Sequence, residues 1–333
     1  MIHRDVIVVG ASAGGIEALI ELVGLLPADL PAAVLICVHL SPTHKSVLPR
    51  ILSGSGPLPA THAQEGEAML PSRIYIAPPD RHLLVDGPVL RVTTGPMENG
   101  HRPAIDPLFR TAARSHGANV IGIILSGSLD DGTAGLGAVK QRGGVCIVQD
   151  PNEAIVADMP RNALQKTEVD HCLPIRDMGR LLLSLVREEL LPGPGVPVPA
   201  LVEHESRIAL DSFTQGVAPP GQPSAFGCPS CGGVLWEVLD GDLLRFRCRV
   251  GHAFGTEGLH AEQQAALEGA LWAALRALEE QASLTRRMAA RARELKHAMS
   301  ANRYDQRAQS TEHQARLVRE ALNRGIAAEP AEG

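Results

Sequence analysis

The chain has 333 residues, which predicts two domains or one domain with smaller modules, and its 44% apolar and 20% charged residues exclude wholesale disorder. Its 31 lysines and arginines against 37 aspartates and glutamates give a formal charge of −6, so we expect no nucleic-acid partner. No apolar run reaches the ~18 residues of a membrane helix, and Asp5 interrupts any signal peptide, so we expect a cytoplasmic location without membrane association.

Residues 5–190 are predicted to alternate between strands and helices. The run Val6–Val9 is continuously apolar and ends at Gly10, which is typical of a strand inside a parallel sheet. Further strands are predicted at 33–38, 73–77, 119–125 and 145–148, and helices at 16–26, 46–52, 106–116 and 134–141. A hairpin around Asp86-Gly87 is expected at a sheet edge. This alternation predicts an α/β fold with a doubly wound, mainly parallel sheet and helices on both faces.

The composition changes at Leu191, after a first domain at residues 1–190. Residues 191–225 are rich in Pro and Gly and are predicted to be a linker, with a short amphipathic piece near 201–211. Residues 226–257 hold three of the six cysteines and form a candidate zinc knuckle. Residues 258–327 carry leucines at helical spacing, which predicts a tail made of one long helix or a helical hairpin.

A glycine-rich turn, Gly10 to Gly15, separates the first strand from the first helix. A dinucleotide-binding turn would need a glycine where Ser12 stands, and an acidic residue where His39 ends the second strand. The alternative is a nucleophile turn, because small neighbours let Ser12 sit on a sharp bend beside the positive end of a helix. Ser12 could also merely cap that helix.

Candidate partners for a nucleophilic serine follow two other strands. His39 ends the strand at 33–38, and Asp130 and Asp131 come just after the strand at 119–125. Because ligands bind outside the carboxyl ends of parallel strands, we expect these groups to meet Ser12 at one sheet edge. A strand-end histidine can instead be a surface residue, and Asp-Asp-Gly a simple turn. The order Ser, His, Asp differs from the order of α/β-hydrolases, so we do not expect that fold.

Six segments together resemble one known family, the CheB-type protein-glutamate methylesterases of bacterial chemotaxis. They are Val9–Leu19, Val38–Leu40, Tyr75–His82, His101–Phe109, Ile124–Gly132 and Met159–Arg161. The resemblance covers roughly residues 5–185. It implies hydrolysis of glutamyl methyl esters on receptor cytoplasmic helices with release of methanol, and deamidation of receptor glutamines as a second activity.

The resemblance also implies a role for each site residue. Ser12 corresponds to the nucleophile, His39 to the base, and Asp131 rather than Asp130 to the acid that orients the base. The backbone amides near Ala13 and Ser128 are the expected oxyanion donors. Catalysis is expected to need no cofactor.

The sequence departs from the family pattern near the expected site. Ala13 stands where threonine is usual, Gly127-Ser128-Leu129 replaces Gly-Met-Gly, and Asp158 replaces the glycine of Gly-Met-Pro. No receiver domain precedes the first strand of this sequence, so we expect no regulation by aspartyl phosphorylation within the chain. His101 and Arg102 match a family segment, and we favour a salt-bridged loop over a cleft-lining role for them.

The second cysteine cluster has the spacing of a metal site. Cys228-x2-Cys231 and Cys248-x3-His252 flank a predicted hairpin at 234–246, so the two pairs can close a tetrahedral zinc site. A module this small has few apolar residues, and a structural metal would compensate for them. Free thiols or a redox pair are the alternatives.

The sequence leaves further alternatives open for the function, for the nucleophile and for the role of the tail. The fold could serve a non-catalytic signalling or receptor-binding module, or the site could act on a small-molecule ester. Cys37 shares a strand face with His39 and could be a thiol nucleophile, although a buried strand residue is favoured. The helical tail is expected to pack or oligomerise, or to bind other signalling proteins.

Overall fold

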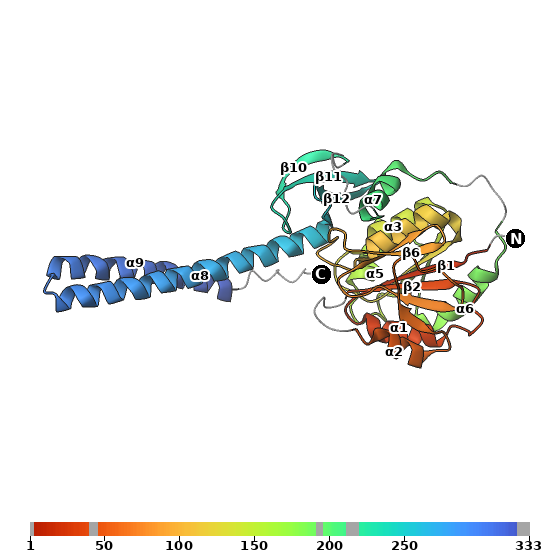
Figure 1. Cartoon of the computed structure of the whole chain (residues 1–333), viewed down its shortest axis with the longest axis horizontal. Helices are drawn as coiled ribbons and strands as arrows, with labels where there is room; N and C mark the ends of the chain where they lie inside the picture. Colours follow the sequence, from red (N-terminus) through yellow and green to blue (C-terminus); the bar gives the residue numbers. More distant parts are fainter. Residues whose placement is uncertain (1–2, 40–45, 191–195, 211–219, 325–333) are drawn as a thin grey trace. The chain divides into compact units, whose positions relative to one another are not determined.

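The computed structural model describes residues 3–39, 46–190, 196–210 and 220–324 (Figure 1). Parts of the expected linker, 191–195 and 211–219, and the end of the expected tail, 325–327, lie outside the described residues. The chain divides into two compact units, Met1–Leu259 and His260–Gly333. In the described part of the chain, no helix has an apolar stretch that could cross a membrane.

The first unit is built around a seven-stranded parallel sheet with the strand order β3-β4-β2-β1-β7-β8-β9. The strands are β1 (Val6–Ala11), β2 (Ala33–Val38), β3 (Ala60–His62), β4 (Arg73–Ile76), β7 (Val120–Ile124), β8 (Val145–Gln149) and β9 (His171–Leu173). The chain moves from β1 to β2 on one side and later crosses to β7 on the other. The carboxyl end of β1 is therefore the switch point at which such sheets bind ligands.

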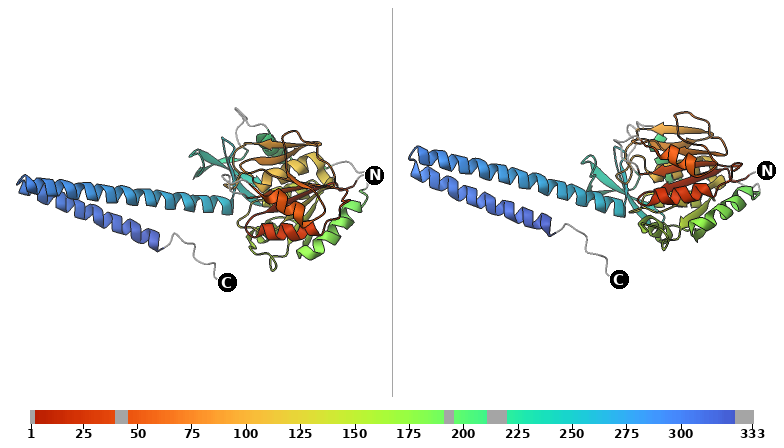
Figure 2. Two further views of the ribbon diagram at one scale, coloured as in Figure 1. Left: turned by 60° about the horizontal axis from the view of Figure 1, so that its bottom comes forward. Right: turned by 90° about the horizontal axis from the view of Figure 1, so that it is seen from below.

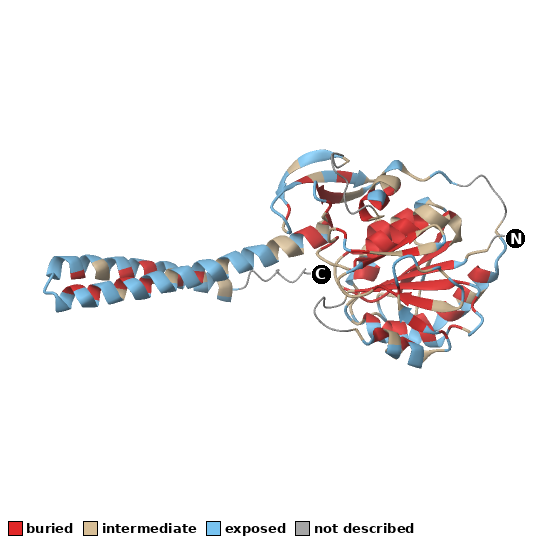
Figure 3. Ribbon diagram, viewed as in Figure 1, coloured by how far each residue is buried: buried red, intermediate tan, exposed pale blue. Residues whose placement is uncertain are grey.

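Helices cover both faces of the sheet, as Figure 1 shows. One layer contains α1 (Gly15–Gly24), α2 (Leu48–Ser55) and α6 (Ile175–Arg187), and the other contains α3 (Ile105–His116), α4 (Thr133–Gln141) and α5 (Asp158–Lys166). Alternate residues of β1 serve the two layers, since Ile7 and Val9 pack with α1 while Val6 and Val8 pack with α3. The central strands β1 and β2 are buried along their whole length (Figure 3). The predicted doubly wound parallel α/β fold is confirmed.

The predicted hairpin forms as β5 (His82–Asp86) and β6 (Val89–Thr93), but its predicted place was wrong. It is a separate two-stranded sheet and not an edge of the main sheet. Its apolar side chains Leu83 and Val85 pack into the α3 layer, and Thr111 of α3 accepts a hydrogen bond from the amide of Val85 at 3.1 Å. The hairpin therefore packs on α3, because its buried apolar side chains contact that helix.

A small antiparallel sheet completes the first unit. It consists of β10 (Gln222–Gly227), β11 (Val234–Asp240), β12 (Leu243–Cys248) and β13 (Ala253–Gly255). The predicted hairpin at 234–246 corresponds to β11 and β12, with Gly241-Asp242 as the connecting residues. The segment expected to be a linker also contains a helix, α7 (Ala200–Leu210), which packs against α3. We call β10–β13 and their connections the Cys/His module.

The second unit is a helical hairpin, one of the two forms expected for the tail. It consists of the part of α8 (Thr256–Glu294) beyond Leu259 and α9 (Ala298–Asn323), which lie side by side in all views (Figure 2). Small residues fill the seam, among them Ala289 and Ala308, which are fully buried. Arg286 pairs with Asp305 and Glu312 across the hairpin.

Candidate active site

Ser12 lies in the turn between β1 and α1. Gly14 has a φ of +69°, and a Cβ there would lie 2.6 Å from the Cβ of Ile155, so this turn requires glycine. Gly14 is the N-cap of α1, and no side chain caps that helix. The interpretation of Ser12 as a helix cap is therefore wrong, and its hydroxyl is available for other contacts.

Ser12, His39 and Asp131 form a continuous hydrogen-bonded chain. The Ser12 Oγ lies 3.0 Å from Nδ1 of His39, and Nε2 of His39 lies 2.7 Å from Oδ2 of Asp131. The side chains of His39 and Asp131 are only 8% and 2% exposed. The three residues come from the carboxyl ends of β1, β2 and β7, so the sheet edge brings them together as expected.

Asp131 is held as an ionised acceptor. Besides His39, it accepts hydrogen bonds from the amides of Ile105 at 2.7 Å and Asp106 at 3.2 Å, and from Nδ2 of Asn99 at 2.9 Å. Burial alone would raise the pKa of Asp131, but the hydrogen bond and charge of His39 and the Ile105 amide outweigh it and hold that pKa well below its ordinary value.

The state of Asp131 fixes the proton on His39. An ionised carboxylate only accepts, so Nε2 of His39 must donate to Asp131. Nδ1 of the neutral ring is then free to accept the hydroxyl proton of Ser12. This is the arrangement that a general base for a serine nucleophile requires.

Asp130, which the residue pattern alone could not distinguish from Asp131, faces a different environment. It lies 3.7 Å from Nζ of Lys166 and accepts a hydrogen bond from the amide of Gly258 at 3.2 Å. Burial raises the pKa of Asp130, and Lys166 opposes this effect. Among the two aspartates, Asp131 is the one that contacts His39.

His101 and Arg102 differ in their relation to the site. The ring of His101 stacks on His39 with centroids 3.7 Å apart, and burial, followed by the charge of His39, lowers the pKa of His101. Arg102 binds Asp80 through two nitrogens at 2.7 and 2.9 Å. Arg102 is therefore part of a salt-bridged loop, as the sequence favoured. His101 instead lies against His39, the candidate base.

The two expected oxyanion donors belong to two turns close to Ser12. Ala13 follows it directly in an exposed turn, and Ser128 is in the turn after β7. A Cβ at Gly127 would lie 2.9 Å from the Cβ of Ser12 and 2.0 Å from the sulfur of Met159, which shows how closely this turn approaches the serine. The replacement of Gly-Met-Gly by Gly127-Ser128-Leu129 therefore still leaves the backbone of this turn beside Ser12.

Cys37 does not have the surroundings of a nucleophile. It is fully buried, and burial, with the charges of Asp131 and Asp106, raises the pKa of its thiol well above the ordinary value. A thiol in this state is rarely a thiolate at neutral pH. The hypothesis of a Cys–His pair is therefore not supported.

Sequence reasoning missed Asn99 and Asp106. Asn99 is buried and donates from Nδ2 to both Asp131 and Asp106, at 2.9 and 3.1 Å. Asp106 is the second residue of α3, and its Oδ1 accepts hydrogen bonds from the amides of Gly132 and Gly135. Neither residue follows a strand of the parallel sheet, so the pattern that found Ser12 could not find them.

The four predicted metal ligands come together in the Cys/His module. The ligand atoms of Cys228, Cys231, Cys248 and His252 all lie within 4.8 Å of one another. The sulfurs of Cys231 and Cys248 are 3.7 Å apart, and Nδ1 of His252 lies 3.7 and 3.5 Å from the sulfurs of Cys228 and Cys248. Zinc–sulfur bonds of about 2.3 Å in a tetrahedron would separate two sulfurs by about 3.8 Å, so the donor set fits this metal.

A parallel α/β sheet with a Ser–His–Asp chain at its switch point is an arrangement typical of serine hydrolases. Residues 7–182, more than half of the chain, match the profile of the family described as CheB methylesterase. The chain therefore belongs to the CheB methylesterase family.

Named relatives and a solved structure agree with this assignment. The chain is 40% identical over 186 residues to protein-glutamate methylesterase/protein-glutamine glutaminase 5 of Anaeromyxobacter dehalogenans, covering 55% of this chain and 51% of the relative. It is 35% identical over 192 residues to a protein of the same description from Methanosarcina mazei, covering 55% and 52%. The chain spans about half the length of the curated relatives it matches.

The structure is similar to the crystal structure of the Thermotoga maritima CheB methylesterase catalytic domain. The TM-score is 0.54 with 30% sequence identity, and the match covers 56% of this chain and all of that domain. The part of the chain beyond residue 190, including the Cys/His module and the helical hairpin, lies outside the family match.

Proposed function

We propose that this protein hydrolyses methyl esters of glutamyl side chains on the cytoplasmic helices of receptors. The single observation that carries the proposal is the chain of hydrogen bonds from Ser12 through His39 to Asp131 at the switch point of a methylesterase fold. We also propose deamidation of receptor glutamines by the same site. The relatives' names, which include protein-glutamine glutaminase, support this second activity. Such receptor segments place the reaction in the cytoplasm.

The reaction proceeds through an acyl-enzyme. Ser12 Oγ attacks the ester carbonyl carbon while Nδ1 of His39 takes the hydroxyl proton. The carbonyl electron pair moves to oxygen, and the amides of Ala13 and Ser128 donate to this oxyanion. Asp131 stabilises the protonated ring through Nε2.

Collapse of the oxyanion breaks the ester C–O bond, and the proton on His39 leaves with the methoxide as methanol. Water then attacks the acyl carbon as Nδ1 of His39 takes one of its protons, and this proton returns to Ser12 when the acyl–serine bond breaks; the glutamic acid product loses the other proton to solvent. With glutamine as the substrate, ammonia replaces methanol as the leaving group.

We further propose that Cys228, Cys231, Cys248 and His252 hold a structural zinc ion. The donor set fills all four positions, so the metal supplies folding stability and no open position for substrate. The proposed organisation is a catalytic domain at 1–190, a connecting segment at 191–225, a zinc module at 226–257 and a helical tail at 258–327. We propose that this tail binds other signalling proteins.

Methanol release from a methylated receptor cytoplasmic fragment tests the function. The wild type should release methanol, while Ser12→Ala should release none above the uncatalysed rate. Equal release by both proteins would exclude Ser12 as the nucleophile.

A fluorophosphonate probe, which phosphonylates activated serines, separates the remaining alternatives. Labelling of Ser12 without methanol release would indicate an esterase for another substrate. Absence of both labelling and release would favour the non-catalytic binding module.

A further inference from the structure

The Cys/His module contacts the candidate active site through strand β13. This strand starts at Ala253, directly after the metal-ligand position His252. Its carbonyl oxygen at Ala253 accepts the amide of Asn99 at 2.7 Å, and its amide at Gly255 donates to Oδ1 of Asn99 at 2.7 Å. Two backbone groups of the module therefore hold one residue of the first domain.

Asn99 connects this strand to the Ser–His–Asp chain. Because Oδ1 accepts from Gly255, Nδ2 faces the carboxylates, and it donates to Oδ1 of Asp131 at 2.9 Å. The carbonyl oxygen of Asn99 also accepts from Nδ1 of His101 at 2.6 Å, and His101 stacks on His39. Asn99 has a φ of +51°, an unusual conformation that its neighbours must maintain.

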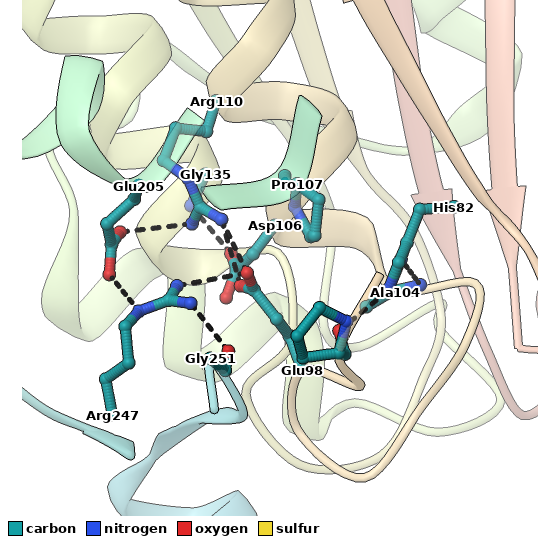
Figure 4. Close-up of polar contacts among 12 residues, drawn as sticks. His82, Glu98, Ala104, Asp106, Pro107, Arg110, Gly135, Glu205, Arg247 and Gly251 are labelled. Atoms are coloured by element: carbon teal, nitrogen blue, oxygen red, sulfur yellow. Dashed lines mark hydrogen bonds and ion pairs between the residues drawn. The ribbon is translucent and has the colours of Figure 1, made fainter. Parts of the chain in front are cut away.

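A second set of contacts, the buried ion cluster, joins α3, α7 and β12 to the loop that carries Glu98 (Figure 4). It contains Glu98, Arg110, Glu205, Arg245 and Arg247, whose side chains are each at most 3% exposed. Arg247 binds Glu98 and Glu205, both at 3.0 Å, and also donates to the carbonyl of Gly251 at 2.7 Å. Glu98 directly precedes Asn99, so the turn that carries the metal ligands is tied to the residue that orients Asp131.

The turn at Gly251 depends on the ligand pair around it. The amide of Gly251 donates to the carbonyl of Cys248, and the amide of Cys248 to the carbonyl of His252. A Cβ at Gly251, whose φ is +109°, would lie 2.8 Å from Pro96 in the loop that leads to Glu98. A metal that binds Cys248 and His252 therefore fixes both the start of β13 and the position of this loop.

We propose that the Cys/His module is a metal-dependent positioning device for the active site, in which the metal-held turn and β13 fix Asn99, and Asn99 orients Asp131. The inference rests on the proposed function, since it assigns a control to the same site. Asn99 is a positioning residue, because its side chain contacts Asp131 and acts on the reacting atoms only through that residue. Loss of the metal releases β13, and Asp131 then orients His39 less well.

The test measures phosphonylation of Ser12 by a fluorophosphonate probe in the full chain, loaded with zinc, stripped by a chelator and reloaded. Stripping should lower the maximal labelling rate roughly 10–100-fold, as expected for a small misplacement of catalytic groups, and leave the apparent affinity for the probe unchanged. Reloading with zinc should restore the rate.

The variant Asn99→Ala should lower the maximal rate to a similar extent while retaining zinc. Stripping zinc from Asn99→Ala should then have little further effect, because the two changes act through the same contact. Asn152→Ala, an exposed asparagine, and Cys172→Ser, an exposed cysteine outside the cluster, are the matched controls and should label at the wild-type rate.

Each contrary result has a separate meaning. Equal labelling of zinc-loaded and stripped protein, a full additional loss in stripped Asn99→Ala, or a wild type that binds no zinc would each overturn the positioning role. A zinc-loaded wild type that is not labelled at Ser12 would instead overturn the proposed function.

Discussion

Two carboxylates share one buried site but have opposite tendencies to ionise. Asp131 receives four hydrogen bonds, one of them from His39, and its pKa is held low. Burial, and then the charge of Asp131, raises the pKa of Asp106 to about 7. Nδ2 of Asn99 donates to both. The site therefore concentrates its negative charge on the carboxylate that faces the base.

Replacing Asp131 with asparagine tests the value of this charge. In Asp131→Asn the side chain keeps its shape, but it no longer stabilises a protonated His39 and its amide nitrogen meets donor groups. We expect the turnover number to fall about 10⁴-fold, the loss known for the same change in a Ser-His-Asp protease. The measurement is the rate of methanol release at saturating substrate, and a loss below tenfold would contradict the role of Asp131.

Asp106 gives a prediction about pH. The pKa of Asp106 rises on folding from 3.8 to about 7, so between these two values the folded chain binds more protons than the unfolded chain, and stability is lost as the pH rises from about 4 to about 7. Asp106→Asn cannot ionise and should lack this loss. Between about pH 5 and pH 8.5, the unfolding free energy of the wild type should therefore fall relative to that of Asp106→Asn. Urea denaturation of both proteins at each pH measures this change. A constant difference would contradict the raised pKa.

The residues that the sequence could predict are those that follow strands. Ser12 and His39 directly follow buried strands and Asp131 lies in the turn after β7, and a parallel sheet places such strand ends at one edge. Choosing Asp131 over Asp130 needed the family resemblance, since both follow β7. Asn99 lies in a loop whose path depends on β13, far away in the chain, and no local pattern specifies that contact.

At the scale of elements, the buried ion cluster is the main polar contact between α3, α7 and β12. Glu205 of α7 binds Arg245 of β12 at 2.6 Å and lies 3.2 Å from Arg110 of α3. Removing one partner from such a cluster leaves a desolvated charge without compensation, which is far more costly than losing a surface pair.

The cluster predicts a large difference between two charge removals on α7. Glu205→Gln should lower the free energy of unfolding by about 3–5 kcal/mol, because buried arginines lose their counter-charge. Arg207→Ala, which removes the exposed partner of Glu203, should change it by less than about 0.5 kcal/mol. Denaturant unfolding of both variants at equal zinc loading checks this, and similar effects at the two positions would contradict it.

The elements found from sequence were those with strong periodic patterns. The central strands and α1, α3 and α4 lie within two or three residues of their predicted bounds. The edge strands β3 and β9 have three residues each and partly exposed side chains, so they carry no apolar run to recognise. The β5–β6 hairpin is positioned by its packing on α3. The residues of its turn predict that a hairpin forms but not which element it packs on.

At the scale of the whole molecule, the two compact units have different kinds of core. The first unit buries large branched side chains between its sheet and helices, while the helical hairpin buries mainly alanines along its seam. A seam of small residues lets helices approach closely and leaves little space for a larger side chain. The stability of the hairpin should therefore respond to added volume independently of the active site.

The variant Ala308→Leu makes this independence measurable. Ala308 is fully buried in the seam, and the three added carbons should destabilise the hairpin by about 1–3 kcal/mol through overpacking. Faster amide hydrogen exchange in α9 should accompany unchanged fluorophosphonate labelling of Ser12. Ala321→Leu, an exposed position on the same helix, should leave both readouts unchanged. A slower labelling rate in Ala308→Leu would show that the hairpin and the site are energetically coupled, and the positioning of Asp131 would then depend on the second unit as well as on the Cys/His module.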